Sequence, residues 1–162
     1  MSNIGLTTLQ DINKLKNLQK LACVLNPDIS TLNLSNMINL TYVECQANNI
    51  STLNISGLVN LQTLYCNNNN LSELIASNLL NLKYLNCAYN KLTALDISGL
   101  TALQSFYCNK NNLVLLPTLT SKNLISNYSF TYNDFSNDEL NRFRSLGFTN
   151  ETKLIPQNSQ PT

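Results

Sequence analysis

The cysteines of this 162-residue chain recur at a nearly constant spacing. Cys45, Cys66, Cys87 and Cys108 lie 21 residues apart, and Cys23 precedes Cys45 by 22. These five residues are all the cysteine that the chain contains. A period in this range is typical of a solenoid, in which each repeat is one structural unit and neighbouring units stack. The spacing constrains the architecture more than any other feature, but it does not identify a ligand.

Apolar residues and asparagines follow the same register as the cysteines. Counted from Leu82 as place one, the repeat has leucine at places one, four and eleven, Cys87 at place six and Asn90 at place nine. The first half alternates between apolar and polar residues, which predicts a half-buried strand. Six copies between about residues 18 and 135 therefore predict six parallel strands. We expect these strands to be centred near Cys23, Cys45, Cys66, Cys87, Cys108 and Phe130.

The run from Leu82 to Leu92 resembles the leucine-rich repeat family. The short repeat with the tail Asp96-Ile97-Ser98-Gly99-Leu100 resembles bacterial cell-surface members, including internalin-like proteins. The resemblance implies an α/β solenoid, a right-handed horseshoe with a parallel concave sheet of about six strands. Short 3₁₀ or extended segments would form its convex side. In the family, the asparagine at place nine bonds buried backbone groups of the turn.

The chain is expected to divide into four segments. Residues 1–17 form a partial repeat, because Leu6, Leu9 and Ile12 match the convex half of a repeat, and residues 18–135 are the leucine-rich repeats. Residues 136–148 are a C-terminal capping helix, and 149–162 a proline-containing tail or linker. An uncapped solenoid end exposes core, so we expect upstream repeats or another cap to have been removed. The alternative is that the partial repeat is itself the cap.

The capping helix has a recognisable beginning and end. Ser136 and Glu139 match a capping box, with serine as the N-cap and glutamate three places later. Gly147 suits the helix end. We expect a helix from Asn137 to Leu146.

The cysteines themselves are expected to be small buried hydrophobes. Zinc sites usually have close cysteine pairs and often histidine, whereas this chain has no close pair and no histidine. Five is an odd number, and neighbours on parallel strands rarely have disulfide geometry. Without histidine, an acid–base step would fall to other residues, and no nucleophile–base pair is evident. We therefore expect no metal, no cofactor and no enzymatic activity.

Charge and hydropathy exclude few partners. The net charge of +1 indicates no general attraction to nucleic acid, and no apolar run is long enough for membrane insertion. The start, Met1 to Gly5, lacks a signal-peptide pattern. The resemblance implies an extracellular or cell-surface protein from which a targeting segment is missing, and the alternative is a cytoplasmic one.

The concave face is the predicted binding surface, because alternate strand residues leave opposite faces of a sheet. It is rich in tyrosine and asparagine, which suit adaptable binding surfaces. The candidate ligand-binding residues are Tyr42, Glu44, Tyr65, Asn67, Lys83, Tyr84, Asn86, Tyr89, Tyr107, Asn109, Lys110 and Tyr132. The tyrosines Tyr42, Tyr65, Tyr84 and Tyr107 come from four successive strands and predict an exposed aromatic stripe.

Two classes of function remain open at this point. The first is a non-catalytic interaction module that binds a protein or peptide through the concave face. The alternative is a glycan-binding module of a bacterial surface protein, since aromatic rings beside asparagine also suit sugars, or a structural spacer. The sequence specifies neither the ligand nor the oligomeric state.

Overall fold

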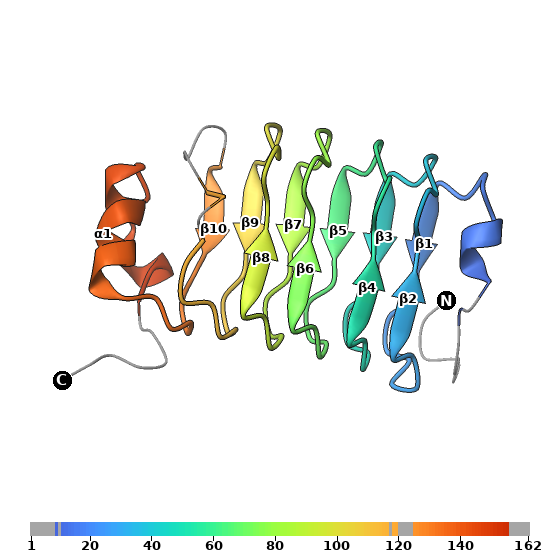
Figure 1. Ribbon diagram of the computed structural model, residues 1–162, viewed down its shortest axis with the longest axis horizontal. Helices are drawn as coiled ribbons and strands as arrows, with labels where there is room; N and C mark the ends of the chain where they lie inside the picture. The colour runs from blue at the N-terminus through green and yellow to red at the C-terminus, as the bar shows by residue number, and fades with distance from the viewer. Residues whose placement is uncertain (1–8, 10, 117, 120–124, 156–162) are drawn as a thin grey trace.

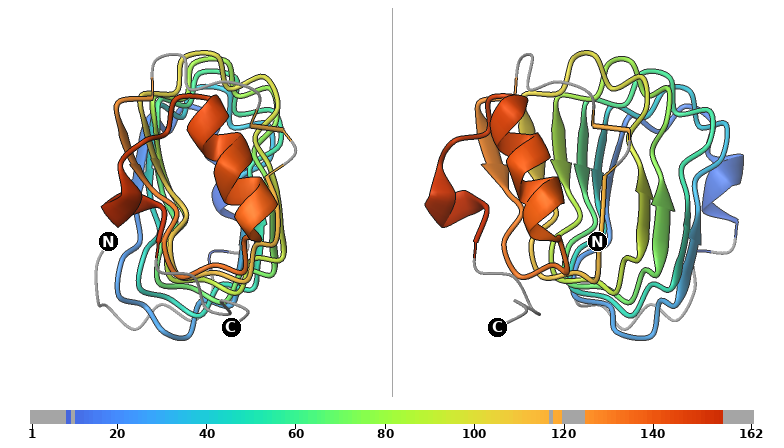
Figure 2. Two further views of the ribbon diagram at one scale, coloured as in Figure 1. Left: turned by 90° about the vertical axis from the view of Figure 1, so that its left-hand side faces the viewer. Right: turned by 60° about the vertical axis from the view of Figure 1, so that its left-hand side comes forward.

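Ten short strands, each parallel to its partner, build the described part of the chain. The computed structural model describes residues 9, 11–116, 118–119 and 125–155. Each repeat runs up one side of the solenoid and down the other, so that the chain winds around a flattened tube (Figures 1 and 2). The predicted parallel solenoid is confirmed.

One side of the tube is a six-stranded sheet with the order β1-β3-β5-β7-β9-β10. Its strands come from successive repeats in sequence order, as stacking of like units requires. They are β1 (Lys20–Ala22), β3 (Tyr42–Glu44), β5 (Thr63–Tyr65), β7 (Tyr84–Asn86), β9 (Ser105–Tyr107) and β10 (Asn127–Ser129). The middle residue of each strand is buried and the two outer residues are not, which is the predicted alternation.

The strands lie about two residues earlier than predicted, because each ends just before place six. Cys66 shows the reason. Its N–H still donates to Asn86 O at 2.9 Å, as in a sheet. Its carbonyl instead accepts the side-chain amides of Asn69 at 3.1 Å and Asn90 at 3.0 Å. The asparagines therefore end the backbone ladder where the cysteine carbonyl leaves it.

The opposite side is extended rather than 3₁₀-helical, which decides between the two predicted alternatives. Its strands are β2 (Thr31–Asn33), β4 (Thr52–Asn54), β6 (Glu73–Ile75) and β8 (Ala94–Asp96). They form two separate two-stranded sheets, β2-β4 and β6-β8. We call this side the outer strand side.

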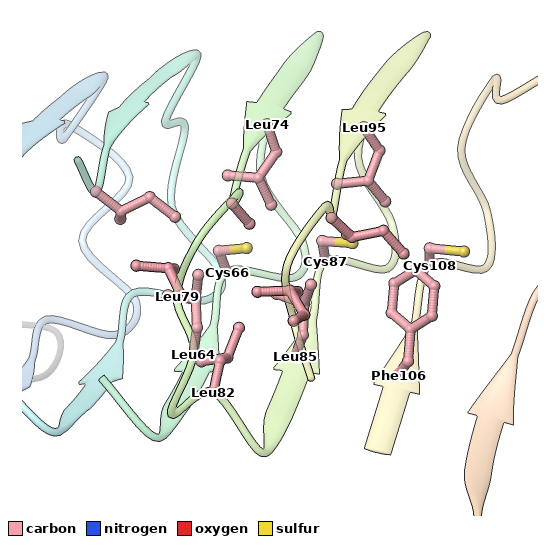
Figure 3. Packing of buried hydrophobic residues seen from close by; sticks show 14 of the residues in the cluster. Leu64, Cys66, Leu74, Leu79, Leu82, Leu85, Cys87, Leu95, Phe106 and Cys108 are labelled. Carbon is pink, nitrogen blue, oxygen red and sulfur yellow. The ribbon is translucent and has the colours of Figure 1, made fainter. Parts of the chain in front are cut away.

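Between the two sides, the cysteines and leucines of successive repeats stack in register. Cys66, Cys87 and Cys108 form a row with their sulfur atoms in the core, beside Leu64, Leu85 and other apolar side chains (Figure 3). All five thiols are free and buried. Toward the C-terminus, Phe106 replaces a leucine and Phe130 replaces the cysteine, and their ring centroids are 5.4 Å apart. The core is thus one continuous column.

The C-terminal helix α1 (Asn137–Ser145) covers the end of this column (Figure 2). The Ser136 side chain accepts from Glu139 N, as predicted for the N-cap. The Glu139 carboxylate, however, accepts from Leu116 N at 2.8 Å and from Arg142, so only half of the expected capping box forms. Gly147 has a φ of +96° and its N–H donates to Arg144 O, which ends the helix as predicted.

The terminal segments also contact the repeats. At the N-terminal end, η1 (Ile12–Lys14) buries Ile12, whereas Leu15 is exposed. At the other end, η2 (Glu151–Lys153) follows the helix, and Lys153 O accepts from Phe130 N at 2.7 Å. Part of the segment predicted as a tail therefore lies against place six of the last repeat. Leu6 and residues 156–162 lie outside the described residues, and the four-segment division stays a prediction.

Candidate functional site

Four tyrosines occupy the outward face of the six-stranded sheet. Tyr42 and Tyr84 are the first residues of β3 and β7, whereas Tyr65 and Tyr107 are the last residues of β5 and β9. First and last residues of a three-residue strand lie on the same face. The tyrosines therefore alternate between two rows and follow a zigzag across four strands. We call the surface made by these four residues the tyrosine face.

The rings of the tyrosine face contact one another in sequence. The ring centroids are 6.1 Å apart for Tyr42 and Tyr65, 4.7 Å for Tyr65 and Tyr84, and 5.7 Å for Tyr84 and Tyr107. Distances of this size are typical of favourable aromatic pairs. The strands are in register, with Tyr84 opposite Thr63 and Asn86 opposite Tyr65, so the Tyr65–Tyr84 contact is diagonal. The predicted stripe exists as one continuous row of tilted rings in contact.

These ring contacts change the predicted exposure of the tyrosines. All four are half-buried rather than fully exposed, since each ring covers part of its neighbour. Burial, with the neighbouring tyrosines, raises the pKa of Tyr84 to about 12. The hydrogen bond from the Tyr42 hydroxyl to Glu44, at 2.5 Å, is the main cause that raises the pKa of Tyr42 to about 12. Both hydroxyls therefore stay protonated at neutral pH.

A second group of predicted residues lies at the strand exits. Lys110 Nζ is 4.8 Å from the ring centroid of Tyr89 and 5.2 Å from that of Tyr132, which is cation–π distance. All three residues stand two places after the cysteine position and have positive φ, between 55° and 56°. In the three preceding repeats, Leu25, Ala47 and Asn68 have the same conformation. The side chains of one repeat place are thus brought into one row.

The predicted asparagines differ from one another in their hydrogen bonds. Asn86 Oδ1 accepts from Ala88 N at 3.1 Å and is engaged by the turn. Asn67 Oδ1 is buried and has no hydrogen-bond partner, and the same is true of Gln46 Oε1 in the preceding repeat. Gln46 was not among the predicted site residues, although it holds the same repeat place as Asn67. Lys83 is exposed and Asn109 is half-buried.

The buried cysteines offer little reactivity. Burial raises the pKa of Cys45, Cys66 and Cys87 well above the usual range, and that of Cys23 to about 11. A thiol kept neutral is a poor nucleophile and a poor metal ligand. In the part of the chain that the structure describes, no group of three or more His, Cys, Asp or Glu side chains could hold a metal ion. No described helix is long and apolar enough to span a membrane.

The comparisons with known proteins concern mainly the fold. No protein-family model matches the chain, and no curated protein matches it in sequence. Among solved structures, the chain is similar to one described as the functional domain of InlJ from Listeria monocytogenes, which includes a cysteine ladder. The TM-score is 0.72 at 31% identity, over 77% of this chain and 28% of that one. The chain thus spans under a third of its neighbour's length. Together with the parallel solenoid and its 21-residue period, this likeness shows that the chain has a leucine-rich repeat fold similar to that of an internalin-like domain.

Proposed function

We propose that this domain is a non-catalytic interaction module that binds a protein or peptide through the tyrosine face. The observation that carries the proposal is the unbroken contact among Tyr42, Tyr65, Tyr84 and Tyr107 across four strands. Tyrosine offers a large rigid surface and a hydroxyl at low entropic cost, and it is enriched where proteins bind. Rings held in mutual contact are already ordered, so binding a partner would remove little further side-chain freedom.

Strand preference alone accounts for only part of this pattern. Tyrosine suits strands and packs on cross-strand neighbours, and β-branched residues would serve equally well at those places. Instead Tyr65 lies in register between Glu44 and Asn86, whose polar side chains can donate or accept hydrogen bonds at the edge of an aromatic centre. An aromatic centre with a polar rim is the usual anatomy of a binding interface.

The proposal extends to the location of the protein. The similarity to InlJ from Listeria monocytogenes supports a module displayed at a bacterial surface. The test is to express the full-length gene product and ask whether an external protease removes this domain from intact cells. A domain that is cleaved only after lysis would favour the cytoplasmic alternative.

The direct test compares two variants with the wild-type domain. The wild type is used to identify a partner by pull-down, and the partner is then titrated against a variant in which Tyr65, Tyr84 and Tyr107 are all alanine. Central aromatic anchors often contribute about 2 kcal/mol or more each to binding. We expect the triple variant to lose measurable binding while it keeps a folded circular-dichroism spectrum.

The matched control is Thr31→Ala, an exposed substitution on the outer strand side. It should leave the affinity unchanged. If the triple variant binds as tightly as the wild type, the tyrosine face is not the site. If a glycan array gives the only ligand, the domain belongs to the alternative class of glycan-binding modules.

A further inference from the structure

The outer strand side is interrupted in the middle of the solenoid. β2 pairs with β4 and β6 pairs with β8, but β4 and β6 do not pair. On the opposite side, β3, β5 and β7 of the same repeats remain hydrogen-bonded without a break. Figure 1 shows the wider separation between β4 and β6. At this joint between repeats, the six-stranded sheet is continuous and only the outer strand side is open.

The intact joints show which hydrogen bonds are missing. Between β2 and β4, Leu34 N donates to Asn54 O at 2.8 Å and Asn36 N donates to Ser56 O at 2.9 Å. The bonds between β6 and β8 follow the same pattern, from Ala76 N to Asp96 O and from Asn78 N to Ser98 O. Each of these two intact joints thus has a ladder of backbone hydrogen bonds that continues past the end of its strands.

At the β4–β6 joint, the residues at the equivalent places are Ile55 and Gly57 as donors, with Ile75 and Ser77 as acceptors. Neither of these described backbone pairs forms a hydrogen bond. Ile55 is almost fully buried, so its unpaired N–H is costly unless something else accepts from it. The joint therefore leaves strand-edge donors on one wall and strand-edge acceptors on the other.

The turns that follow the outer strands contact one another in the same pairs of repeats. A Cβ built on Gly57 would lie 2.6 Å from Asn36 Oδ1, and one on Gly99 would lie 3.0 Å from Asn78 Oδ1. Each asparagine side chain therefore lies over the glycine of the next repeat. Gly57 and Asn78 make no such contact, because the glycine lies in the earlier of these two repeats and the asparagine in the later one. This alternation of asparagine and glycine is consistent with repeats coupled in pairs and an opening between the pairs.

A cleft of about 510 Å³ occupies the open joint. Its walls include Ser51 and Leu53 on one side and Glu73 and Ile75 on the other. Leu53 is only half-buried, whereas the leucines at its place in β2, β6 and β8 are buried, and Ile75 is 64% exposed. The volume falls within the range of ligand sites. Apolar contacts are therefore available beside the unpaired backbone.

We propose that this cleft binds a short extended peptide, which adds as a strand between β4 and β6. A strand presents N–H and C=O groups along both edges with a two-residue repeat of about 6.6 Å, which matches walls made of strand edges. Strand addition draws its affinity from such main-chain bonds and its specificity from alternate side chains. This site is separate from the tyrosine face and does not depend on it.

Two further observations define the peptide. Hydrogen bonds from Asn70 N to Ile50 O and from the Asn81 side chain to Val59 O, each 2.9 Å, hold the repeats together at both ends of the cleft. The open stretch between them suits a segment of about four to six extended residues. Among the described residues that line the cleft, Glu73 is the only charged one, which favours a lysine or arginine in the peptide.

The test begins with a displayed library of random hexapeptides, selected on the wild-type domain. The best peptide is synthesised in its ordinary form and with every backbone nitrogen methylated. We expect methylation to weaken binding at least tenfold, because it removes the main-chain donors. Amide hydrogen exchange should slow at least tenfold at Ile55 and Gly57 in the complex and stay unchanged at Val43 and Leu64.

Matched variants locate the binding. Thr52→Trp would cover the cleft mouth and should weaken binding at least tenfold, whereas Thr31→Trp, its register partner in β2, should have no effect. The proposal is overturned if no hexapeptide is enriched, if methylation is harmless, or if the Ile55 amide stays unprotected. It is also overturned if every selected peptide ignores Thr52→Trp but requires Tyr84. That last outcome would leave the tyrosine face intact as a binding site, so the two proposals fail separately.

Discussion

The side-chain amide of Asn69 donates a hydrogen bond of 2.9 Å to the carbonyl oxygen of Cys45, one repeat earlier in the chain. The same nitrogen donates to Cys66 O in its own repeat at 3.1 Å, and Asn69 Oδ1 accepts from Ile50 N at 3.0 Å. One buried side chain thus satisfies three backbone groups in two repeats. The arrangement recurs at Asn48, Asn90, Asn111 and Asn133.

Replacing Asn69 by alanine should therefore be among the most damaging single changes. The variant leaves the Ile50 N–H without its partner, at about 1–3 kcal/mol for an unsatisfied group. It also removes one of the two amide bonds to Cys45 O and to Cys66 O, at about 0.5–1.5 kcal/mol for each bond. We expect a loss of about 3 kcal/mol or more in the free energy of unfolding, measured by urea denaturation. Asn112→Ala, an exposed asparagine in the same chain, should change stability by less than about 0.5 kcal/mol. Equal effects of the two variants would contradict the role of the asparagine row.

Cys66→Ser should destabilise the domain by about 1–3 kcal/mol, since it buries a hydroxyl. The nearest acceptor is Asn86 O, 3.5 Å from the sulfur, which is too far for a good O–H···O bond. Cys66→Ala opens only a small cavity and should cost less. Denaturation of both variants gives the comparison, and a serine variant as stable as the wild type would show that the site tolerates a polar atom.

Stability should fall as the pH rises above about 8.5, the usual thiol pKa. Burial raises the pKa of Cys45, Cys66 and Cys87 in the folded protein, so only the unfolded chain loses these protons. The native state then binds more protons than the unfolded state, and the free energy of unfolding declines with pH. The expected loss at pH 10 is about 2 kcal/mol per thiol. A Cys66→Ala variant should show a smaller decline, and an unchanged stability between pH 7 and 10 would contradict the burial of the thiols.

Hydrogen bonds from Arg142 hold helix α1 against the last repeats. Its guanidinium donates to Leu116 O at 2.8 Å, to Leu119 O at 2.7 Å and to both oxygens of Glu139. Arg142→Ala should cost about 1.5–3 kcal/mol, the range for hydrogen bonds to charged groups. Arg144→Ala is the matched control, because Arg144 pairs with Glu151 at the surface, where solvent screening leaves an ion pair with little effect on stability. Thermal unfolding of the two variants distinguishes this half-buried hydrogen-bond network from a surface ion pair.

The hydrogen bonds between Arg142 and the Glu139 carboxylate should weaken in acid. Burial opposes ionisation of Glu139, but the hydrogen bonds from Arg142 and Leu116 N outweigh it and lower its pKa. A carboxylate with a lowered pKa stabilises the fold above its unfolded pKa of about 4.3, and the contribution is lost as the pH falls below that value. Glu139→Gln should remove this part of the acid dependence. A wild type and variant with parallel stability curves between pH 3 and 6 would contradict it.

Much of this fold was predictable from the cysteine period. Stacked repeats place the same residue of each copy in the same environment, so one register assigns the core, the strands and the buried asparagine row. The predicted C-terminal helix was confirmed for the same kind of reason, because Ser136 and Gly147 act on groups close to them in the chain. The strand positions were off by about two residues, since the carbonyl of Cys66 is taken by asparagines of two repeats.

The sequence by itself determined the solenoid, its register and which side chains face inward, because these follow from the periodicity of the repeat. The tertiary structure alone decided how side chains of different repeats meet. It placed Tyr65 against Tyr84 on a diagonal, directed Glu139 to Leu116 instead of Ser136, and left β4 and β6 unpaired. Each of these depends on distances between non-equivalent residues in neighbouring repeats. A pattern that repeats along the chain cannot specify them, because it treats every joint between repeats as the same.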